Sequence, residues 1–181
     1  EVIEGTETYA ETDAIDDFSI THTVGKGRGW LFKFSLTGKF VSKVELTRGD
    51  AYHPGGIDFD GTHIWVPVAE YRPNSKSNIY KIDPQEMTGN MVFSVDDHIG
   101  NMIYNPVSES FHGSSWGGRR LYHWKLDTKG QKISESWQKN QSHYIDYQDC
   151  HYAGSGMMLC GGVQTYETSN GKFSLGGLEL V

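Results

Sequence analysis

A histidine that opens a strand-like run recurs at one fixed spacing, and this repeat is the feature that most constrains the fold. His53, His98 and His143 lie 45 residues apart in both steps. Each begins a segment whose pattern predicts short strands separated by turns. Sequence periods of about 20–50 residues indicate solenoids, propellers or other repeat arrays. Units of about four short strands favour the β-propeller among these.

The repeat divides the chain into an N-terminal arm and four blade-like units. Residues 1–17 are acidic and show little periodicity, which predicts an arm or loop. The strand pattern predicts a partial blade over 18–52, full blades over 53–97 and 98–142, and a partial blade over 143–181. Closed propellers have about 4 to 8 four-stranded blades. We therefore expect an all-β chain that is an incomplete or internal segment of a β-propeller with four-stranded blades.

Alternating apolar and polar residues indicate where the strands lie. Trp30–Phe34 and Phe40–Leu46 both alternate, which predicts an amphipathic hairpin. Asp60-Gly61 stands between two further strand-like runs, Gly55–Phe59 and His63–Val68, and predicts another hairpin, since glycine accepts the positive φ of a primed turn. Gly55–Phe59 would be the innermost strand of its blade. The phrase Ile79–Asp83 recurs in the next unit as Tyr122–Asp127, with lysine aligned on lysine. This match supports the repeat.

The charge and hydropathy of the chain limit its partners. A net charge of −7 argues against nucleic acid or anionic lipid as the main partner. No apolar run is long enough to cross a bilayer, and no signal peptide is recognisable. The chain opens Glu1-Val2-Ile3 without a methionine, so we expect that an upstream segment has been removed or omitted.

The repeated histidines predict a site in the propeller channel. Equivalent positions of successive innermost strands converge on the channel axis, so His53, His98 and His143 would form a ring that suits Zn²⁺, Fe²⁺, Cu²⁺ or Mn²⁺. Carboxylates near the ring, Asp146 and Asp149 among them, would act as bases, as further ligands or as partners that orient the imidazoles. The alternative is structural: each histidine would hydrogen-bond the backbone of a neighbouring blade.

Two further segments are candidate ligand-binding sites. Glu70 and Arg72 follow a predicted strand and so belong to a loop at one rim, where ligands usually bind; the alternative is a surface loop of mixed charge. Trp116 stands close to Arg119 and Arg120, a combination that would stack on a sugar or hold a carboxylate. The alternative for Trp116 is packing between blades.

The two cysteines flank a predicted turn. Cys150 and Cys160 are placed symmetrically about Ser155, which would set them opposite each other on adjacent strands. A disulfide is then geometrically possible and would indicate an oxidising compartment. Two buried free thiols are the other possibility, and the sequence leaves both open.

Three longer motifs carry a family resemblance. The runs His53–Pro73, Val95–His98 and Tyr144–Cys150 resemble an uncharacterised β-propeller family of secreted bacterial and fungal proteins. The resemblance covers most of the chain from about Gly27 onward. It implies a propeller fold in proteins longer at both ends, and a secreted or periplasmic location whose signal peptide lies outside this chain. It implies no activity.

A more distant similarity involves the start of an innermost strand. Pro54-Gly55-Gly56-Ile57 is similar to the Pro-x-Gly-Ile start found in gluconolactonase, paraoxonase and strictosidine-synthase-like propellers. Those proteins hold calcium with Glu, Asn and Asp residues that face the channel. This resemblance adds Ca²⁺ to the candidate ions Zn, Fe and Mn, although the histidine at the repeated position weighs against calcium.

Two functional hypotheses follow. The first is a metal-assisted hydrolase or lyase acting on a small lactone or carbohydrate-like substrate, with an Asp as base and Arg119 or Arg72 holding a carboxylate. The second is a non-catalytic propeller that binds a protein or glycan partner, or assembles with other propeller segments or copies of itself. The expected ligand in either case is a small molecule or a carbohydrate.

Overall fold

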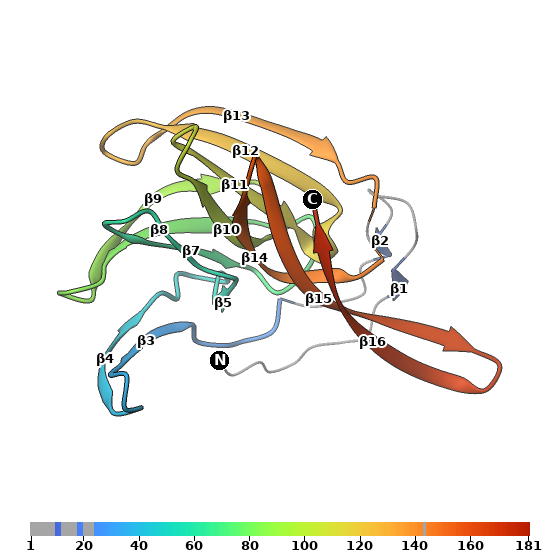
Figure 1. Ribbon diagram of the computed structural model, residues 1–181. Helices are drawn as coiled ribbons and strands as arrows, with labels where there is room; N and C mark the ends of the chain where they lie inside the picture. The colour runs from blue at the N-terminus through green and yellow to red at the C-terminus, as the bar shows by residue number, and fades with distance from the viewer. Residues whose placement is uncertain (1–9, 12–17, 20–23, 143) are drawn as a thin grey trace.

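The described part of the chain consists almost entirely of strands. A computed structural model describes residues 10–11, 18–19, 24–142 and 144–181 (Figure 1). One short 3₁₀ turn, η1 (Trp116–Gly118), is its sole helical element. None of the described residues forms a helix that is long and apolar enough to span a membrane. In chain order the strands are β1 (Ala10–Glu11), β2 (Phe18–Ser19), β3 (Trp30–Phe34), β4 (Phe40–Glu45), β5 (His53–Pro54), β6 (Asp58–Phe59), β7 (Ile64–Ala69), β8 (Ser77–Asp83), β9 (Thr88–Val95), β10 (Ile99–Asn105), β11 (Ser110–Ser115), β12 (Arg120–Leu126), β13 (Lys132–Lys139), β14 (Asp146–Gly154), β15 (Met157–Thr168) and β16 (Gly171–Leu180).

The strands form small antiparallel sheets in which neighbours in the chain are neighbours in space. The two largest sheets have the orders β5-β7-β8-β9, with β6 also paired to β7, and β10-β11-β12-β13. A three-stranded sheet, β14-β15-β16, follows them, and the pairs β1-β2 and β3-β4 precede them. The predicted all-β class with four-stranded blades is therefore confirmed. Among the described residues the sheets do not close into a ring.

The sheets pack face to face in chain order, as propeller blades do. Strand β10 packs against β7 on one side and β14 on the other, and Figure 1 shows these three strands towards the middle of the molecule. A buried cluster lies between the β5-β9 sheet and the β10-β13 sheet. It includes Trp65, Ile79, Met102 and Trp124. A separate buried cluster joins β10 to β14 and β15. Apolar contact between neighbouring sheets therefore determines their arrangement.

The predicted innermost strand over Gly55–Phe59 differs from the structure. It is divided into β5 and β6. The Gly55 N–H still donates to the Pro67 carbonyl oxygen of β7 at 2.9 Å, but the next residue, Gly56, pairs with the following sheet. The Gly56 N–H donates to the Gly100 carbonyl oxygen at 2.8 Å, and the Met102 N–H donates to the Gly56 carbonyl oxygen at 3.1 Å. Gly56 and Asn101 form an isolated parallel bridge. This bridge links two consecutive sheets at their inner edges.

The predicted hairpin at Asp60-Gly61 is present between β6 and β7. Gly61 has a φ of +94°. The Asp60 carboxylate accepts hydrogen bonds from the amides of Thr62 (2.8 Å) and His63 (2.7 Å) and from the indole nitrogen of Trp65 (2.7 Å). The aspartate therefore stabilises the turn and also positions a core tryptophan.

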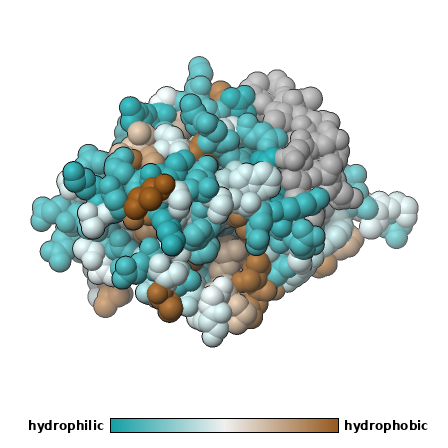
Figure 2. All heavy atoms as spheres, turned by 90° about the horizontal axis from the view of Figure 1, so that it is seen from above, coloured by the Kyte–Doolittle hydropathy of each residue, from teal (hydrophilic) through white to brown (hydrophobic). Residues whose placement is uncertain are grey.

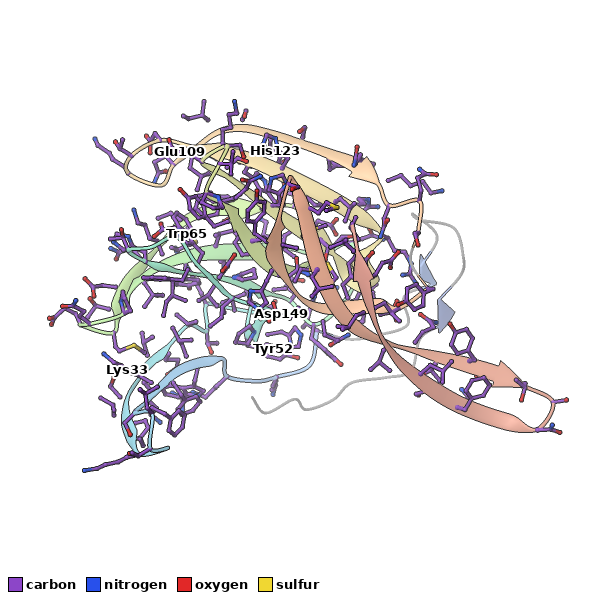
Figure 3. The ribbon with its side chains drawn as sticks, viewed as in Figure 1. Lys33, Tyr52, Trp65, Glu109, His123 and Asp149 are labelled. Atoms are coloured by element: carbon purple, nitrogen blue, oxygen red, sulfur yellow. A yellow bond between two sulfur atoms is a disulfide. The ribbon has the colours of Figure 1, made fainter. Side chains whose placement is uncertain are left out.

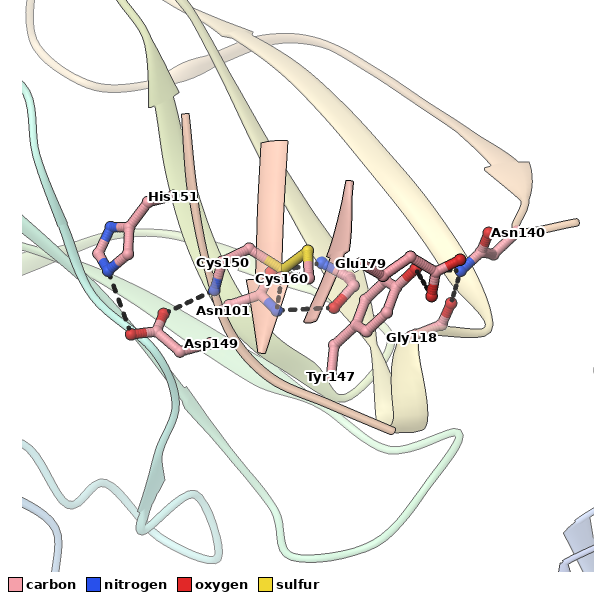
Figure 4. Close-up of a disulfide and its surroundings, with 10 residues drawn as sticks. Asn101, Gly118, Asn140, Tyr147, Asp149, Cys150, His151, Cys160 and Glu179 are labelled. Atoms are coloured by element: carbon pink, nitrogen blue, oxygen red, sulfur yellow. Dashed lines mark hydrogen bonds and ion pairs between the residues drawn. A yellow bond between two sulfur atoms is a disulfide. The ribbon is translucent and has the colours of Figure 1, made fainter. Parts of the chain in front are cut away.

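A disulfide joins β14 to β15, which decides between the two possibilities that the sequence left open. Cys150 and Cys160 face each other in the strand register, with Cα atoms 4.1 Å apart (Figure 4). No free cysteine is present in the chain that the structure describes. The disulfide is buried, and the Asn101 side-chain amide donates to Cys150 Sγ at 3.5 Å. It therefore lies where β14 meets β10.

The surface is mainly hydrophilic in the view from above, with separate hydrophobic areas (Figure 2). Exposed apolar side chains are most concentrated on two hairpins. Phe32, Phe34 and Phe40 of the β3-β4 pair contact one another and are each about half exposed. The β15-β16 hairpin extends away from the other strands and exposes Phe173 and Leu175.

Candidate functional site

A cavity of about 330 Å³ lies where β5, β10 and β14 begin. Its lining comes from three consecutive sheets and from η1, so residues distant in the sequence meet there. The lining includes the side chains of His53, Tyr71, His98, Trp116, Asp146 and Gln148. We call this cavity the histidine pocket.

Two of the three repeated histidines lie together in this pocket. The ring centres of His53 and His98 are 5.7 Å apart. The Tyr71 ring packs against His53 at 4.7 Å, on the side of the loop after β7. His143, the third histidine of the predicted ring, lies outside the described residues. The 45-residue spacing thus brings two imidazoles into one cavity.

His98 is buried and hydrogen-bonds the backbone of the preceding sheet. Its Nδ1 lies 2.9 Å from the Glu70 carbonyl oxygen, and because a carbonyl only accepts, Nδ1 carries the proton. Burial lowers the pKa of His98 to about 3, the charge of His53 acts in the same direction, and the backbone of Glu70 and Arg72 opposes both. His98 is therefore neutral at pH 7. This contact is the structural role that the sequence left open as an alternative.

We expect the buried imidazole to make folding stability depend on pH. The pKa of His98 is lower in the folded chain than its unfolded value near 6.5. Its contribution to stability is therefore complete above pH 6.5 and is lost as the pH falls. Between pH 7 and pH 5 the wild type should lose about 2 kcal/mol more than His98→Asn, since one pKa unit corresponds to about 1.4 kcal/mol. Urea unfolding of both proteins at the two pH values measures this, and equal losses would contradict it.

Trp116 lines the histidine pocket at the start of η1. Its ring contacts the His98 ring at 4.8 Å and the Tyr71 ring at 5.5 Å, both edge to face. The turn needs glycine, since Gly117 has a φ of +62° and Gly118 a φ of +76°. The three rings form one continuous wall of the pocket.

Asp146, predicted as a catalytic carboxylate, also lines the histidine pocket. Its Oδ1 accepts from an Arg119 guanidinium nitrogen at 2.9 Å, and the same nitrogen donates to the Gly117 carbonyl oxygen at 2.6 Å. Arg119 is buried. It therefore connects the carboxylate to the turn that carries Trp116, and it positions pocket residues without lining the pocket itself.

Asp149, the other predicted catalytic carboxylate, lies outside the pocket lining. Its Oδ1 accepts from the Cys150 amide at 2.9 Å, and its Oδ2 is 3.5 Å from His151 Nε2 (Figures 3 and 4). Burial raises the pKa of Asp149, and the charge of His151 acts against this. The structure therefore does not bring Asp149 together with His53 and His98.

Three predicted ligand-binding residues form ion pairs within the protein. Arg72 pairs with Glu70 at 2.6 Å. Arg120 pairs with the buried Asp97 at 2.8 Å and also donates to the Asn74 side chain at 3.0 Å. Glu70, Arg72 and Arg120 are not among the residues that line the pocket.

The family of the chain follows from its sequence match. The model of a family described as "Family of unknown function (DUF6454)" matches residues 4–181. The chain belongs to this family. No curated protein matches it. The expected membership of an uncharacterised family is confirmed, whereas the likeness to gluconolactonase-type propellers and secretion remain predictions.

This DUF6454 chain is also similar to a solved propeller structure, described as "Structure of Dos1 propeller". The two are 15% identical, with a TM-score of 0.45. The match covers 80% of the DUF6454 chain and 41% of the other. The chain thus spans less than half of that structure.

The sequence did not point to two lining residues of the DUF6454 pocket, Tyr71 and Gln148. Tyr71 lies between Glu70 and Arg72, and its aromatic side chain in a rim loop was the available signal. Gln148 lies two residues after Asp146, so the period of a strand places both side chains on one face. Gln148 was therefore within reach of a strand-period argument from Asp146, whereas only its aromatic side chain marked Tyr71.

The described residues of the DUF6454 chain contain no group of three or more His, Cys, Asp or Glu side chains arranged to hold a metal ion. His53, His98 and Asp146 line one cavity, but His98 Nδ1 is bound to a carbonyl group. Metal ligands often use one imidazole nitrogen in this way and coordinate through the other. The metal site therefore remains a prediction.

Proposed function

We propose that this chain binds a small carbohydrate-like molecule in the histidine pocket. The observation that carries the proposal is the combination of an aromatic wall, made by Tyr71 and Trp116, with polar groups in one cavity of about 330 Å³. Small-molecule sites are typically concave and about 300–1,000 Å³, with a few polar groups that fix orientation.

The chemistry of the lining supports this ligand class. Aromatic rings offer apolar faces to the C–H groups of a sugar ring. The Asp146 carboxylate and the Gln148 amide supply acceptors and donors for hydroxyl groups. The neutral His98 adds no charge, so a neutral polyhydroxylated ligand suits the pocket better than a strongly ionic one.

Tryptophan fluorescence provides the test. Titration with glucose, galactose, N-acetylglucosamine and glucono-δ-lactone should give saturable quenching with at least one of them. Trp116→Ala should weaken that binding about 10-fold or more, because it removes an aromatic contact. Trp30→Ala is the control, since Trp30 lies on β3 and does not line the pocket. Binding to none of the four probes, or equal binding by Trp116→Ala and wild type, would refute the proposal.

A metal-assisted hydrolase or lyase is the second candidate, favoured by the presence of two imidazoles and Asp146 in the same cavity. The predicted ring of His53, His98 and His143 would hold a divalent ion such as Zn²⁺, Fe²⁺, Mn²⁺ or Ca²⁺, because the described residues alone contain no group of three such side chains arranged to hold one. Asp146 would act as the base. The ion would supply polarisation of a carbonyl group or of water. Arg119 would hold Asp146 in place through their ion pair.

Metal analysis of the purified protein separates the two candidates. The hydrolase hypothesis expects a stoichiometric metal that is lost in His53→Ala and His98→Ala. His53→Ala is the safer variant, because His98 is buried and its removal also disturbs folding. Unchanged metal content in His53→Ala would contradict this ligand set and leave the binding proposal standing.

We also propose a secreted or periplasmic location. The Cys150–Cys160 disulfide supports it, because disulfides form and persist mainly in oxidising compartments.

A further inference from the structure

A second cavity, of about 320 Å³, lies between the β10-β13 sheet and the β14-β15 hairpin. One wall carries His112 of β11 and His123 of β12, and the opposite wall carries Met157 and Met158 of β15. None of the residues that line it also lines the histidine pocket. We call it the inter-sheet cavity, and it is independent of the proposed ligand site.

The two histidines of this cavity are a directly opposed cross-strand pair. His112 faces His123 in the antiparallel register, and both side chains are half-buried. Their ring centres are 5.0 Å apart, with an angle of 43° between the planes. Strand pairing therefore holds the two imidazoles side by side.

This spacing suits two imidazoles that share one metal ion. Bonds from an imidazole nitrogen to zinc are about 2.0–2.1 Å long. With comparable bonds, ring centres would lie about 5.2 Å apart at a tetrahedral angle and about 4.5 Å apart at a right angle. The observed 5.0 Å falls between these two values. Little movement of the strands would be needed to bind an ion.

The lining of the cavity selects the kind of ion. The residues described as lining the cavity include no Asp, Glu, Lys or Arg, although 39 of the 181 residues of the chain are of these four types. Hard ions such as Mg²⁺ and Ca²⁺ require oxygen ligands, usually carboxylates. Thioethers are soft ligands that favour Cu⁺, and imidazole also binds copper. A neutral set of imidazole and thioether donors therefore favours a soft ion of low charge.

We propose that His112 and His123 bind one Cu⁺ ion in the inter-sheet cavity, together with a thioether from Met157 or Met158. Nothing in the histidine pocket takes part. Figure 3 labels His123, which lies on the β10-β13 sheet.

The surroundings of His112 favour the neutral imidazole, which is the form that binds a metal ion. Burial lowers the pKa of His112, and the charge of His123 acts in the same direction. His112 is therefore neutral near pH 7, as coordination requires. The His112 Nε2 is 3.3 Å from the Ser110 hydroxyl, which orients the ring.

An anaerobic competition titration tests the proposal. Cu⁺ is supplied with the chromophoric chelator bicinchoninate and kept reduced with ascorbate, because thiol reductants would compete for the ion and attack the disulfide. The wild type should withdraw one equivalent of Cu⁺ from the chelator. His112→Asn and His123→Asn should each lower the affinity about 10-fold or more, and so should the double variant Met157→Leu, Met158→Leu.

Two controls make the result specific. His151→Asn alters an exposed histidine on β14 that does not line the cavity, and it should bind Cu⁺ as the wild type does. His53→Asn should also bind Cu⁺ with wild-type affinity, which would show that the histidine pocket is not the Cu⁺ site. Circular dichroism confirms that each variant is folded. No withdrawal of Cu⁺ by the wild type, or unchanged affinity in folded His112→Asn and His123→Asn, would overturn the proposal. Unchanged affinity in the methionine variant would overturn the thioether ligand.

Discussion

Gly55→Ala should lower the free energy of unfolding by about 2–3 kcal/mol, the upper part of the range for a side chain forced into a space without room. A Cβ at this position would overlap the backbone carbonyl group of Gly100. Because that group belongs to the inner edge of the next sheet, no side-chain rotation can relieve the overlap. The two sheets would have to separate where the Gly56–Asn101 bridge joins them.

The facing glycine provides the matched control. At Gly100 an added Cβ would lie 3.8 Å from its nearest neighbour, the Ser114 carbonyl oxygen, which is an ordinary contact. Gly100→Ala should therefore change stability by less than about 1 kcal/mol. Urea unfolding followed by tryptophan fluorescence measures both variants. The explanation by close approach of the two sheets is wrong if the two substitutions have equal effects.

Asp97→Ala should destabilise the chain by about 3–5 kcal/mol, the usual cost of removing one partner from a buried ion pair. The buried Asp97 carboxylate accepts from the Arg120 guanidinium at 2.8 Å, from the Tyr122 hydroxyl at 2.9 Å and from the His98 amide at 2.8 Å. The substitution removes the acceptor from three groups at once. It also disturbs the entry to β10, where His98 lines the histidine pocket.

Asp96→Ala is the control for this experiment. The Asp96 side chain is 93% exposed and only approaches Lys76 at 3.9 Å, so its loss should cost less than about 1 kcal/mol. Burial raises the pKa of Asp97 to about 6, against the hydrogen bonds from Tyr122 and the His98 amide. Unfolding is therefore best measured at pH 8, where the carboxylate is charged. A loss in Asp97→Ala as small as that in Asp96→Ala would show that the buried pair contributes little.

Local patterns were enough to predict most of the strands. The alternation in Trp30–Phe34 and the Asp60-Gly61 turn depend on residues close in the sequence, and both are present in the structure. The division of the innermost strand into β5 and β6 was not predictable in this way. It depends on Gly56 bonding to Gly100, a contact between sheets that leaves no periodic signal.

The sequence was enough to predict where the candidate site lies, but not which charged side chains form ion pairs there. The repeat spacing indicated that His53 and His98 would meet, because equivalent positions of successive sheets converge. It gave no information on which arginine would pair with Asp146, since that depends on how η1 turns. The His112–His123 pair needs the strand register, and aligning Phe111-His112-Gly113 against Tyr122-His123-Trp124 as a hairpin would have revealed it.

The disulfide has a consequence for how the chain reaches this structure. Shifting a strand by one residue turns every side chain to the opposite face. Cys150 and Cys160 are facing residues, so once they are bonded even the denatured chain retains the correct alignment of β14 with β15. A chain that unfolds with this disulfide intact would therefore refold with the register of β14 and β15 already set. Hairpins with a shifted register would be excluded before any core forms.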